Sequence, residues 1–170
     1  MKDEIDRIVE NWKRERPDLD VSPTHVLQRI TRIALLQETS IAQVLAEFGL
    51  SWGEYLVLAA LRREGPPHRM NPTTLYGSVL LSSGGMTKRL DRLESAGLVK
   101  REPDPADRRG RLVVLTKHGK DLVDRAVVAH LSNEERLLAA LSATDRRKLT
   151  SLLRKLLVSE PFGRLDPQQA

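Results

Sequence analysis

Cysteine is absent from the 170 residues of this chain, and its absence excludes several kinds of site. Without thiols there is no disulfide framework, no thiolate zinc site, no iron–sulfur cluster and no cysteine nucleophile. A chain without cysteine suits a reducing compartment, and the first residues, MKDEIDRIVENW, carry acids where a signal peptide carries an apolar stretch. We therefore expect a cytoplasmic protein.

Aromatic residues and long apolar runs are also scarce. Aromatic side chains make up 4% of the sequence, too few for the stacking platform of a protein that binds single-stranded nucleic acid or flavin. No apolar run approaches the roughly 20 residues that a transmembrane helix needs, so no membrane partner is expected. The length of 170 residues suits one integrated domain with a single sizeable core.

The net charge of +5 is confined to one part of the sequence. Residues 82–120 hold ten lysines and arginines against five acidic residues, whereas the rest of the chain holds 18 of each sign. A local basic surplus is typical of a nucleic-acid-binding surface, although a charged face exposed only to water is the commoner reason for one. The order of the elements around the surplus decides between these two interpretations.

Apolar residues recur at helical spacing through most of the chain, and caps, prolines and glycines mark the ends of the segments. This pattern predicts helices over residues 3–16, 22–49, 51–64, 71–80, 82–97, 116–141 and 142–158, with the fifth helix starting near Ser82 or Ser83. Between residues 98 and 116 the apolar period changes, because two short β-prone runs flank the turn-rich loop PDPADRRG. These two runs predict a β-hairpin.

Two short helices followed by a charged hairpin form the winged helix-turn-helix arrangement. The predicted fold is mainly α with a small β-hairpin wing, and residues 51–116 form the DNA-binding region. The apolar stripe of residues 5–12 and the apolar seam of residues 149–157 have no partner in such a unit, so a second copy is expected to cover them. Residues 1–50, including the extra helix 3–16, and residues 117–160 then form an intertwined all-helical dimerisation region of a homodimer. Residues 161–170 are expected to be a flexible tail.

The basic surplus falls on the second short helix and the hairpin, which predicts binding to double-stranded DNA. The second helix of such a unit lies in the major groove, and an arginine at a short hairpin tip reaches the minor groove. Asp107 can hold one of these arginines by a bidentate ion pair. The candidate DNA contacts are Ser82, Ser83, Gly84, Gly85, Thr87, Lys88, Arg89, Arg92, Arg108, Arg109 and Arg111. A two-fold dimer further predicts a pseudo-palindromic operator. A DNA-binding protein of the cytoplasm is expected to be associated with the nucleoid.

Two other classes of protein stay open at this point. A winged helix also serves as a protein-interaction module, here one that docks an acidic partner. An enzyme that acts on a small acid through Arg63 and His68 needs a convergent base and nucleophile, and the sequence supplies none. The four histidines are scattered, and no nucleotide-binding, esterase or zinc-protease motif is found. We expect no catalytic residue, no cofactor and no metal.

The segment SSGGMTKRLDRLESAGLVKREPDPADRRGRLVVLT, residues 82–116, resembles the MarR family of bacterial transcription regulators. The resemblance rests on RLDRLESAGLV and on the acid and two arginines at 107–109 before the strand VVLT. The family's element order fits residues 5–158, and the resemblance implies a homodimeric transcriptional regulator. ENWKRERPDLDVSP, ALRREGPPHRMNP and AHLSNEERLLAALS are similar to the urate-responsive branch, in which an anionic metabolite releases a repressor from DNA.

In that branch the effector pocket is associated with one tryptophan, one aspartate and two arginines. Trp12, Arg63 and Arg89 match three of these positions, whereas the aspartate position is Leu56. Leu56 has no charge for an anion to repel, so the resemblance implies a small anionic or aromatic effector without supporting urate itself. A repressor that responds to no ligand also remains open because of Leu56.

Overall fold

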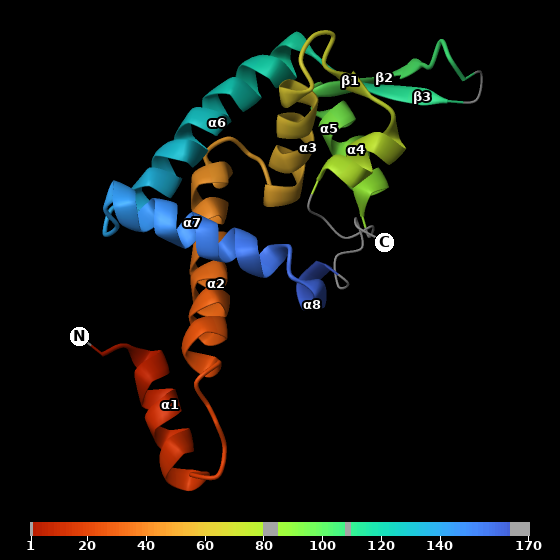
Figure 1. Cartoon of the computed structure of the whole chain (residues 1–170). Coiled ribbons are helices and arrows are strands. Elements are labelled where there is room, and N and C mark those ends of the chain that lie inside the picture. The colour runs from red at the N-terminus through yellow and green to blue at the C-terminus, as the bar shows by residue number, and fades with distance from the viewer. Residues whose placement is uncertain (1, 80–84, 108–109, 164–170) are drawn as a thin grey trace. The chain divides into compact units, whose positions relative to one another are not determined.

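A computed structural model describes residues 2–79, 85–107 and 110–163 of the chain. The chain divides into two compact units, residues 1–43 and residues 44–170. Within the described ranges no helix is long and apolar enough to cross a membrane. The elements in chain order are α1 (Glu4–Glu15), α2 (Thr24–Ala46), α3 (Trp52–Arg63), β1 (Arg69–Met70), α4 (Pro72–Ser78), α5 (Met86–Ser95), β2 (Val99–Pro103), β3 (Arg111–Leu115), α6 (Lys117–Leu137), α7 (Ala143–Leu157) and α8 (Glu160–Gly163) (Figure 1).

The first unit consists of α1 and most of α2. Asp3 begins α1 with a capping box, in which its carboxylate accepts from the backbone N–H of Asp6 and the Asp6 carboxylate accepts from that of Asp3. Ile5 and Val9 form the buried side of α1. Arg29 of α2 donates to Asp3 at 2.9 Å and to Asp6 at 2.7 Å. The predicted N-terminal helix is therefore confirmed, and charged hydrogen bonds tie its first turn to α2.

In the second unit, α3, α4, α5 and α6 enclose an apolar core with the sheet. Its fully buried side chains come from all of these elements and include Leu58, Leu61, Leu75, Leu93, Val113 and Val123. The apolar residues that the helical period placed inward on the two short helices are buried where they are described, namely Leu75, Val79, Met86, Leu90 and Leu93. The mainly α fold with a hairpin wing is confirmed.

The sheet has three antiparallel strands in the order β1-β3-β2. The hairpin pairs Val99 with Leu115 and Pro103 with Arg111, as the two β-prone runs predicted. Strand β1 was not predicted, because a two-residue strand is too short to show an apolar period. It pairs Met70 with Val113 and attaches the base of the hairpin to the segment between α3 and α4.

Several helix boundaries differ from the sequence-based expectation. Helix α2 begins at Thr24 rather than at residue 22 and ends at Ala46 rather than at residue 49. Helix α4 ends at Ser78, before the predicted residue 80. Helix α5 begins at Met86 rather than near Ser82 or Ser83, because Gly85 has φ +94°, a left-handed conformation that does not continue a helix. The helix ends at Ser95, and the predicted glycine Gly97 (φ +68°) follows its C-cap, where the N–H of Leu98 donates to the carbonyl of Leu93 at 2.9 Å. Helix α6 ends at Leu137 and does not continue to residue 141.

Candidate nucleic-acid interface

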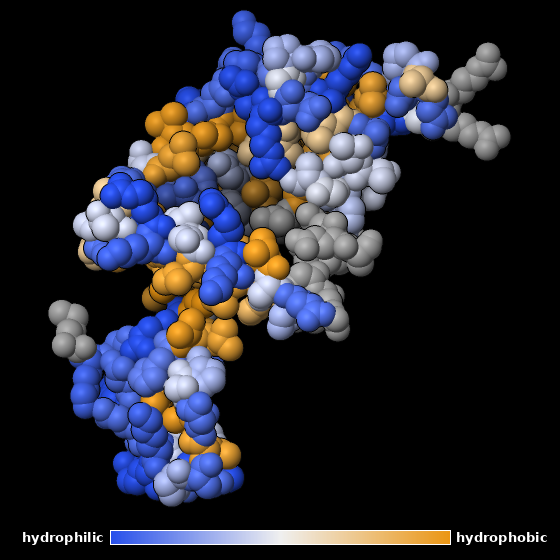
Figure 2. All heavy atoms as spheres, in the orientation of Figure 1, coloured by the Kyte–Doolittle hydropathy of each residue, from blue (hydrophilic) through white to orange (hydrophobic). Residues whose placement is uncertain are grey.

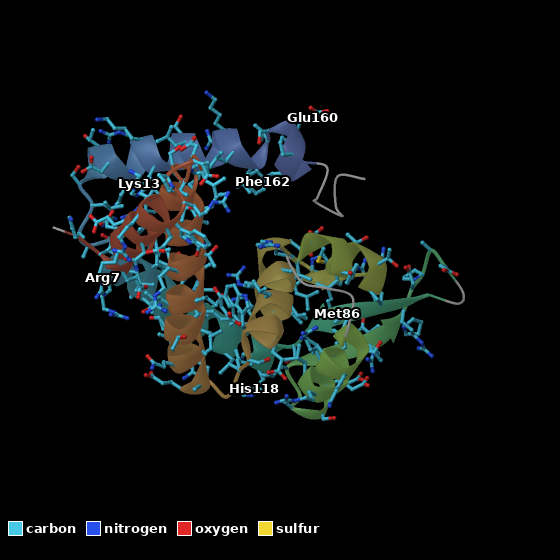
Figure 3. The ribbon with its side chains drawn as sticks, turned by 90° about the horizontal axis from the view of Figure 1, so that it is seen from below. Arg7, Lys13, Met86, His118, Glu160 and Phe162 are labelled. Carbon is cyan, nitrogen blue, oxygen red and sulfur yellow. The ribbon has the colours of Figure 1, made fainter. Side chains whose placement is uncertain are left out.

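Helix α5 has one apolar face and one polar, largely charged face. Met86, labelled at the start of the helix in Figure 3, is buried together with Leu90 and Leu93 where α5 packs on α3 and beside β2. Thr87, Lys88 and Arg92 are exposed. Residues 87, 88, 91, 92 and 95 fall on one side of a helix with 3.6 residues per turn. The structure therefore places three of the predicted DNA contacts on one open helix face.

Arg92 forms an ion pair with a buried acid. Its Nε lies 3.1 Å from Oε1 of Glu54 in the first turn of α3. The Arg92 side chain is 65% exposed, whereas that of Glu54 is 4% exposed. The other carboxylate oxygen of Glu54 accepts from the backbone N–H and the hydroxyl of Ser51 at 2.8 and 2.6 Å. The Ser51–Glu54 spacing predicted this helix cap, but nothing in the sequence indicated the contact with α5.

Arg89 lies in a different environment from Arg92. It is half-buried, and its side chain runs across Gly53 at the start of α3. A Cβ atom added to Gly53 would lie 2.4 Å from Nε of Arg89, so only glycine leaves room for the arginine here. Arg89, which was predicted to contact both DNA and the effector, therefore packs between α3 and α5.

Part of the basic surplus is neutralised by neighbouring acids. Arg101 of β2 donates to Asp91 and to Glu94 of α5, both at 2.6 Å, and the hydrogen bond to Asp91 raises the pKa of the guanidinium. Lys100 pairs with Glu102 in β2, and Lys120 pairs with Asp124 in α6. The positive charge left facing solvent is thus more localised than the sequence count suggests.

The β2–β3 hairpin projects from the second unit (Figure 1). Its turn is held by hydrogen bonds from the Asp104 N–H to the Gly110 carbonyl at 3.1 Å and from the Gly110 N–H to the Asp107 carbonyl at 2.9 Å. Arg111, at the start of β3, is exposed. Whether Asp107 holds an arginine stays a prediction. The remaining predicted contacts, Ser82, Ser83, Gly84, Arg108 and Arg109, lie outside the described residues.

The four predicted effector residues lie on three helices. Trp12 is half-exposed on α1 in the first unit. Leu56 is half-buried on α3, and Arg63, exposed at the end of α3, donates to the carbonyl oxygen of Ser78, the last residue of α4. Arg63 thus caps the carboxyl end of α4. The assembly of Trp12, Leu56, Arg63 and Arg89 into one pocket stays a prediction.

In the part of the chain that the structure describes, His130 contributes to packing rather than to a metal site. Among the described residues, no group of three or more His, Asp and Glu side chains is arranged to hold a metal ion. The buried ring of His130 on α6 lies 5.5 Å from Trp52 and 5.1 Å from Tyr55 between ring centroids. Its Nε2 is 3.2 Å from a carboxylate oxygen of Glu134, and burial raises the pKa of Tyr55. This cluster joins α3 to α6.

Comparison with known proteins agrees with this geometry. A family model described as the MarR family matches residues 48–110. The HTH-type transcriptional regulator PecS of Dickeya dadantii (strain 3937) is 37% identical over 150 residues, which cover 88% of this chain and 90% of that protein. Sco3205, a MarR family transcriptional regulator from Streptomyces coelicolor solved in complex with DNA, matches with a TM-score of 0.75 at 24% identity, covering 88% of this chain and 94% of that one.

A further solved structure is that of Bordetella bronchiseptica BpsR, whose DNA binding is regulated by 6-hydroxynicotinic acid. It matches with a TM-score of 0.70 at 24% identity, covering 79% of this chain and 94% of that one. PecS and Sco3205 are transcriptional regulators, not enzymes. With its helix-turn-helix, its basic α5 face and a relative this similar over most of its length, the chain belongs to the MarR family of DNA-binding transcriptional regulators.

Proposed function

We propose that the protein is a homodimeric repressor that binds a pseudo-palindromic operator and leaves it when a small anionic or aromatic ligand binds. The observation that carries the DNA-binding part is the open face of α5, where Lys88 and Arg92 lie one helical turn apart above a buried apolar face. Helix α5 enters the major groove, and the wing follows the adjacent minor groove. The contacts proposed are Ser82, Ser83, Gly84, Gly85, Thr87, Lys88, Arg89, Arg92, Arg108, Arg109 and Arg111.

The dimer is supported by apolar side chains that a single chain leaves exposed. On α2, Ile33 is 63% exposed and Leu35 and Leu36 are more than half exposed. Helix α7 has no buried residue at all. Val128 and Leu131 of α6 are also more than half exposed, and Figure 2 shows apolar surface along α6 and α7. A monomer rarely exposes so much apolar surface, so we infer that a second copy covers it.

With a second copy covering this surface, dimerisation and DNA binding are assigned to different parts of the chain. Residues 1–50 and 117–160 supply the dimer interface, and residues 51–116 bind DNA. The predicted tail of residues 161–170 begins inside helix α8, which extends to Gly163, and we propose that it takes no part in either role.

Replacing Lys88 with alanine is expected to weaken operator binding about tenfold and to make the dependence of affinity on salt less steep. Each phosphate contact contributes about −0.9 to the slope of log affinity against log salt concentration, because it releases condensed counterions. Loss of the Lys88 contact therefore reduces the slope by about 1. Fluorescence anisotropy with the intergenic DNA beside the protein's own gene measures both quantities.

The matched control is Lys155→Ala, which removes an exposed lysine from α7, outside the proposed DNA surface and off the apolar seam of residues 149–157 that is proposed to face the partner. It should change neither the affinity nor the salt slope. Equal affinity of the unmutated protein for the palindrome and for a scrambled duplex would argue against an operator reader and for the protein-interaction module.

The effector part of the proposal involves Trp12, Leu56, Arg63 and Arg89. The response of BpsR to an aromatic acid supports a ligand of that class. We expect 6-hydroxynicotinic acid or a related aromatic acid to release the operator and to change tryptophan fluorescence. The Trp12→Phe variant should lose the fluorescence change while Trp52 still emits. If no anionic or aromatic compound acts on either readout, the ligand-independent repressor is the correct alternative.

A further inference from the structure

The carboxylate of Glu54 is buried between α3 and α5, and its two oxygens have different partners. We propose that Glu54 is a positioning residue for DNA binding, whose carboxylate fixes the guanidinium of Arg92 so that its outer nitrogens face a phosphate. This inference rests on the proposed function, in which Arg92 contacts DNA.

Ser51 fixes the carboxylate first. Oε2 of Glu54 accepts from the Ser51 N–H at 2.8 Å and from the Ser51 hydroxyl at 2.6 Å. In return the Ser51 hydroxyl accepts from the backbone N–H of Glu54 at 3.4 Å. These bonds set the carboxylate against the first turn of α3, and they leave Oε1 to face α5.

Oε1 then orients Arg92. It lies 3.1 Å from Nε, the nitrogen closest to the arginine backbone. A guanidinium is planar and carries five N–H donors in a rigid fork, so a contact at Nε also fixes the direction of the two Nη groups. Because the side chain is 65% exposed, the Nη edge remains open to a ligand from outside.

The position of Arg92 in α5 favours phosphate over a base edge. Base edges are read by residues at the start of a recognition helix, and Arg92 lies in its second turn. Lys88, Arg92 and Glu54 line one cleft beside α5. Asp91, the other acid of that cleft, accepts from Arg101 at 2.6 Å.

A held arginine binds more favourably than a free one, because it loses less rotamer freedom when the phosphate arrives. Because Glu54 is buried, its carboxylate needs a compensating partner, and the guanidinium of Arg92 supplies one. Glu54 thus has a structural role toward Ser51 and a separable role toward Arg92, and an experiment can distinguish the two.

The test compares Glu54→Gln, Arg92→Ala and the double variant in operator binding and in its salt slope, with thermal melting to confirm that each is folded. Arg92→Ala should weaken binding about tenfold and reduce the slope by about 1. Glu54→Gln should weaken binding about fivefold, and the double variant should match Arg92→Ala alone, since coupled residues are not additive. The matched control is Glu64→Gln, which removes an exposed acid at the other end of α3 and should change neither the affinity nor the slope. Thermal melting reports any loss of stability that follows from weakening the α3 cap.

The inference is overturned if Glu54→Gln tightens binding or leaves it unchanged while Arg92→Ala weakens it, because Glu54 would then compete with DNA for the arginine or be irrelevant to it. It is also overturned if the two losses add in the double variant. If Arg92→Ala and Lys88→Ala both leave binding unchanged, the proposed DNA surface itself is wrong. If Arg92→Ala leaves binding unchanged while Lys88→Ala weakens it, the proposed DNA surface is supported but the positioning role of Glu54 is wrong.

Discussion

Replacing Leu152 of α7 with aspartate is expected to dissociate the proposed dimer and to weaken operator binding by about 100-fold or more. Leu152 is 62% exposed in the single chain, and Leu157, five residues later, is 67% exposed. Full burial of a leucine stabilises by about 1.5–3 kcal/mol, and in a two-fold dimer each substitution occurs twice. The loss of about 3–6 kcal/mol corresponds to at least a 100-fold shift in the dimer equilibrium.

Sedimentation or light scattering measures the assembly, and anisotropy measures operator binding at the same concentration. Ser151→Asp places the same charge on the preceding residue, which lies on the side of α7 away from the apolar seam of residues 149–157, and should leave the dimer intact. Because Leu152 is exposed in the single chain, the dissociated protein should retain its helical circular dichroism wherever the monomer is stable. A Leu152→Asp protein that still sediments as a dimer would show that α7 is not at the interface.

Replacing Gly119 with alanine is expected to lower the free energy of unfolding by about 3 kcal/mol and Tm by about 10 °C. Gly119 is buried in the first turn of α6, and an added Cβ would lie 2.0 Å from the Leu98 carbonyl oxygen and 3.0 Å from Cδ1 of Leu115. The first of these neighbours is backbone, so the clash is not relieved by a rotamer change. The start of α6 would have to move away from the turn between α5 and β2.

Gly77→Ala is the matched control, since nothing lies within 4 Å of its added Cβ and it is also a helical glycine. Alanine has the higher helix propensity, so this variant should be neutral or slightly more stable. Differential scanning calorimetry of both proteins makes the comparison. Equal melting temperatures for the two variants would mean that α6 does not pack on Leu98 as described.

Local signals in the sequence predicted most of the fold. Capping residues at Ser51, Asn71, Thr116 and Ser142 begin helices in the structure at or next to the expected positions. A cap is decided by residues three or four positions apart, so it can be read without knowing the tertiary structure. The predicted start of α5 was wrong because Gly85 has φ +94°. Glycine adopts positive and negative φ about equally readily, so its backbone conformation could not be predicted from the sequence.

The candidate site was less predictable than the fold, because its contacts join segments far apart in the sequence. Glu54 was recognised as a cap, but its pairing with Arg92 depends on how α5 packs on α3. Gly53 gave no signal, since its role is to leave space for Arg89. The pairing of Arg101 with Asp91 and Glu94 likewise could not be found from charge counting.

The bonds from Arg101 to Asp91 and Glu94 have a mechanical consequence. They fasten the strand that leads into the wing to the exposed side of α5, so a rotation of the helix carries the hairpin with it. If α5 and the wing both contact DNA as proposed, these ion pairs fix the distance between the two contacts. We then expect the protein to favour duplex sequences that deform easily to that spacing, including at base pairs it does not touch.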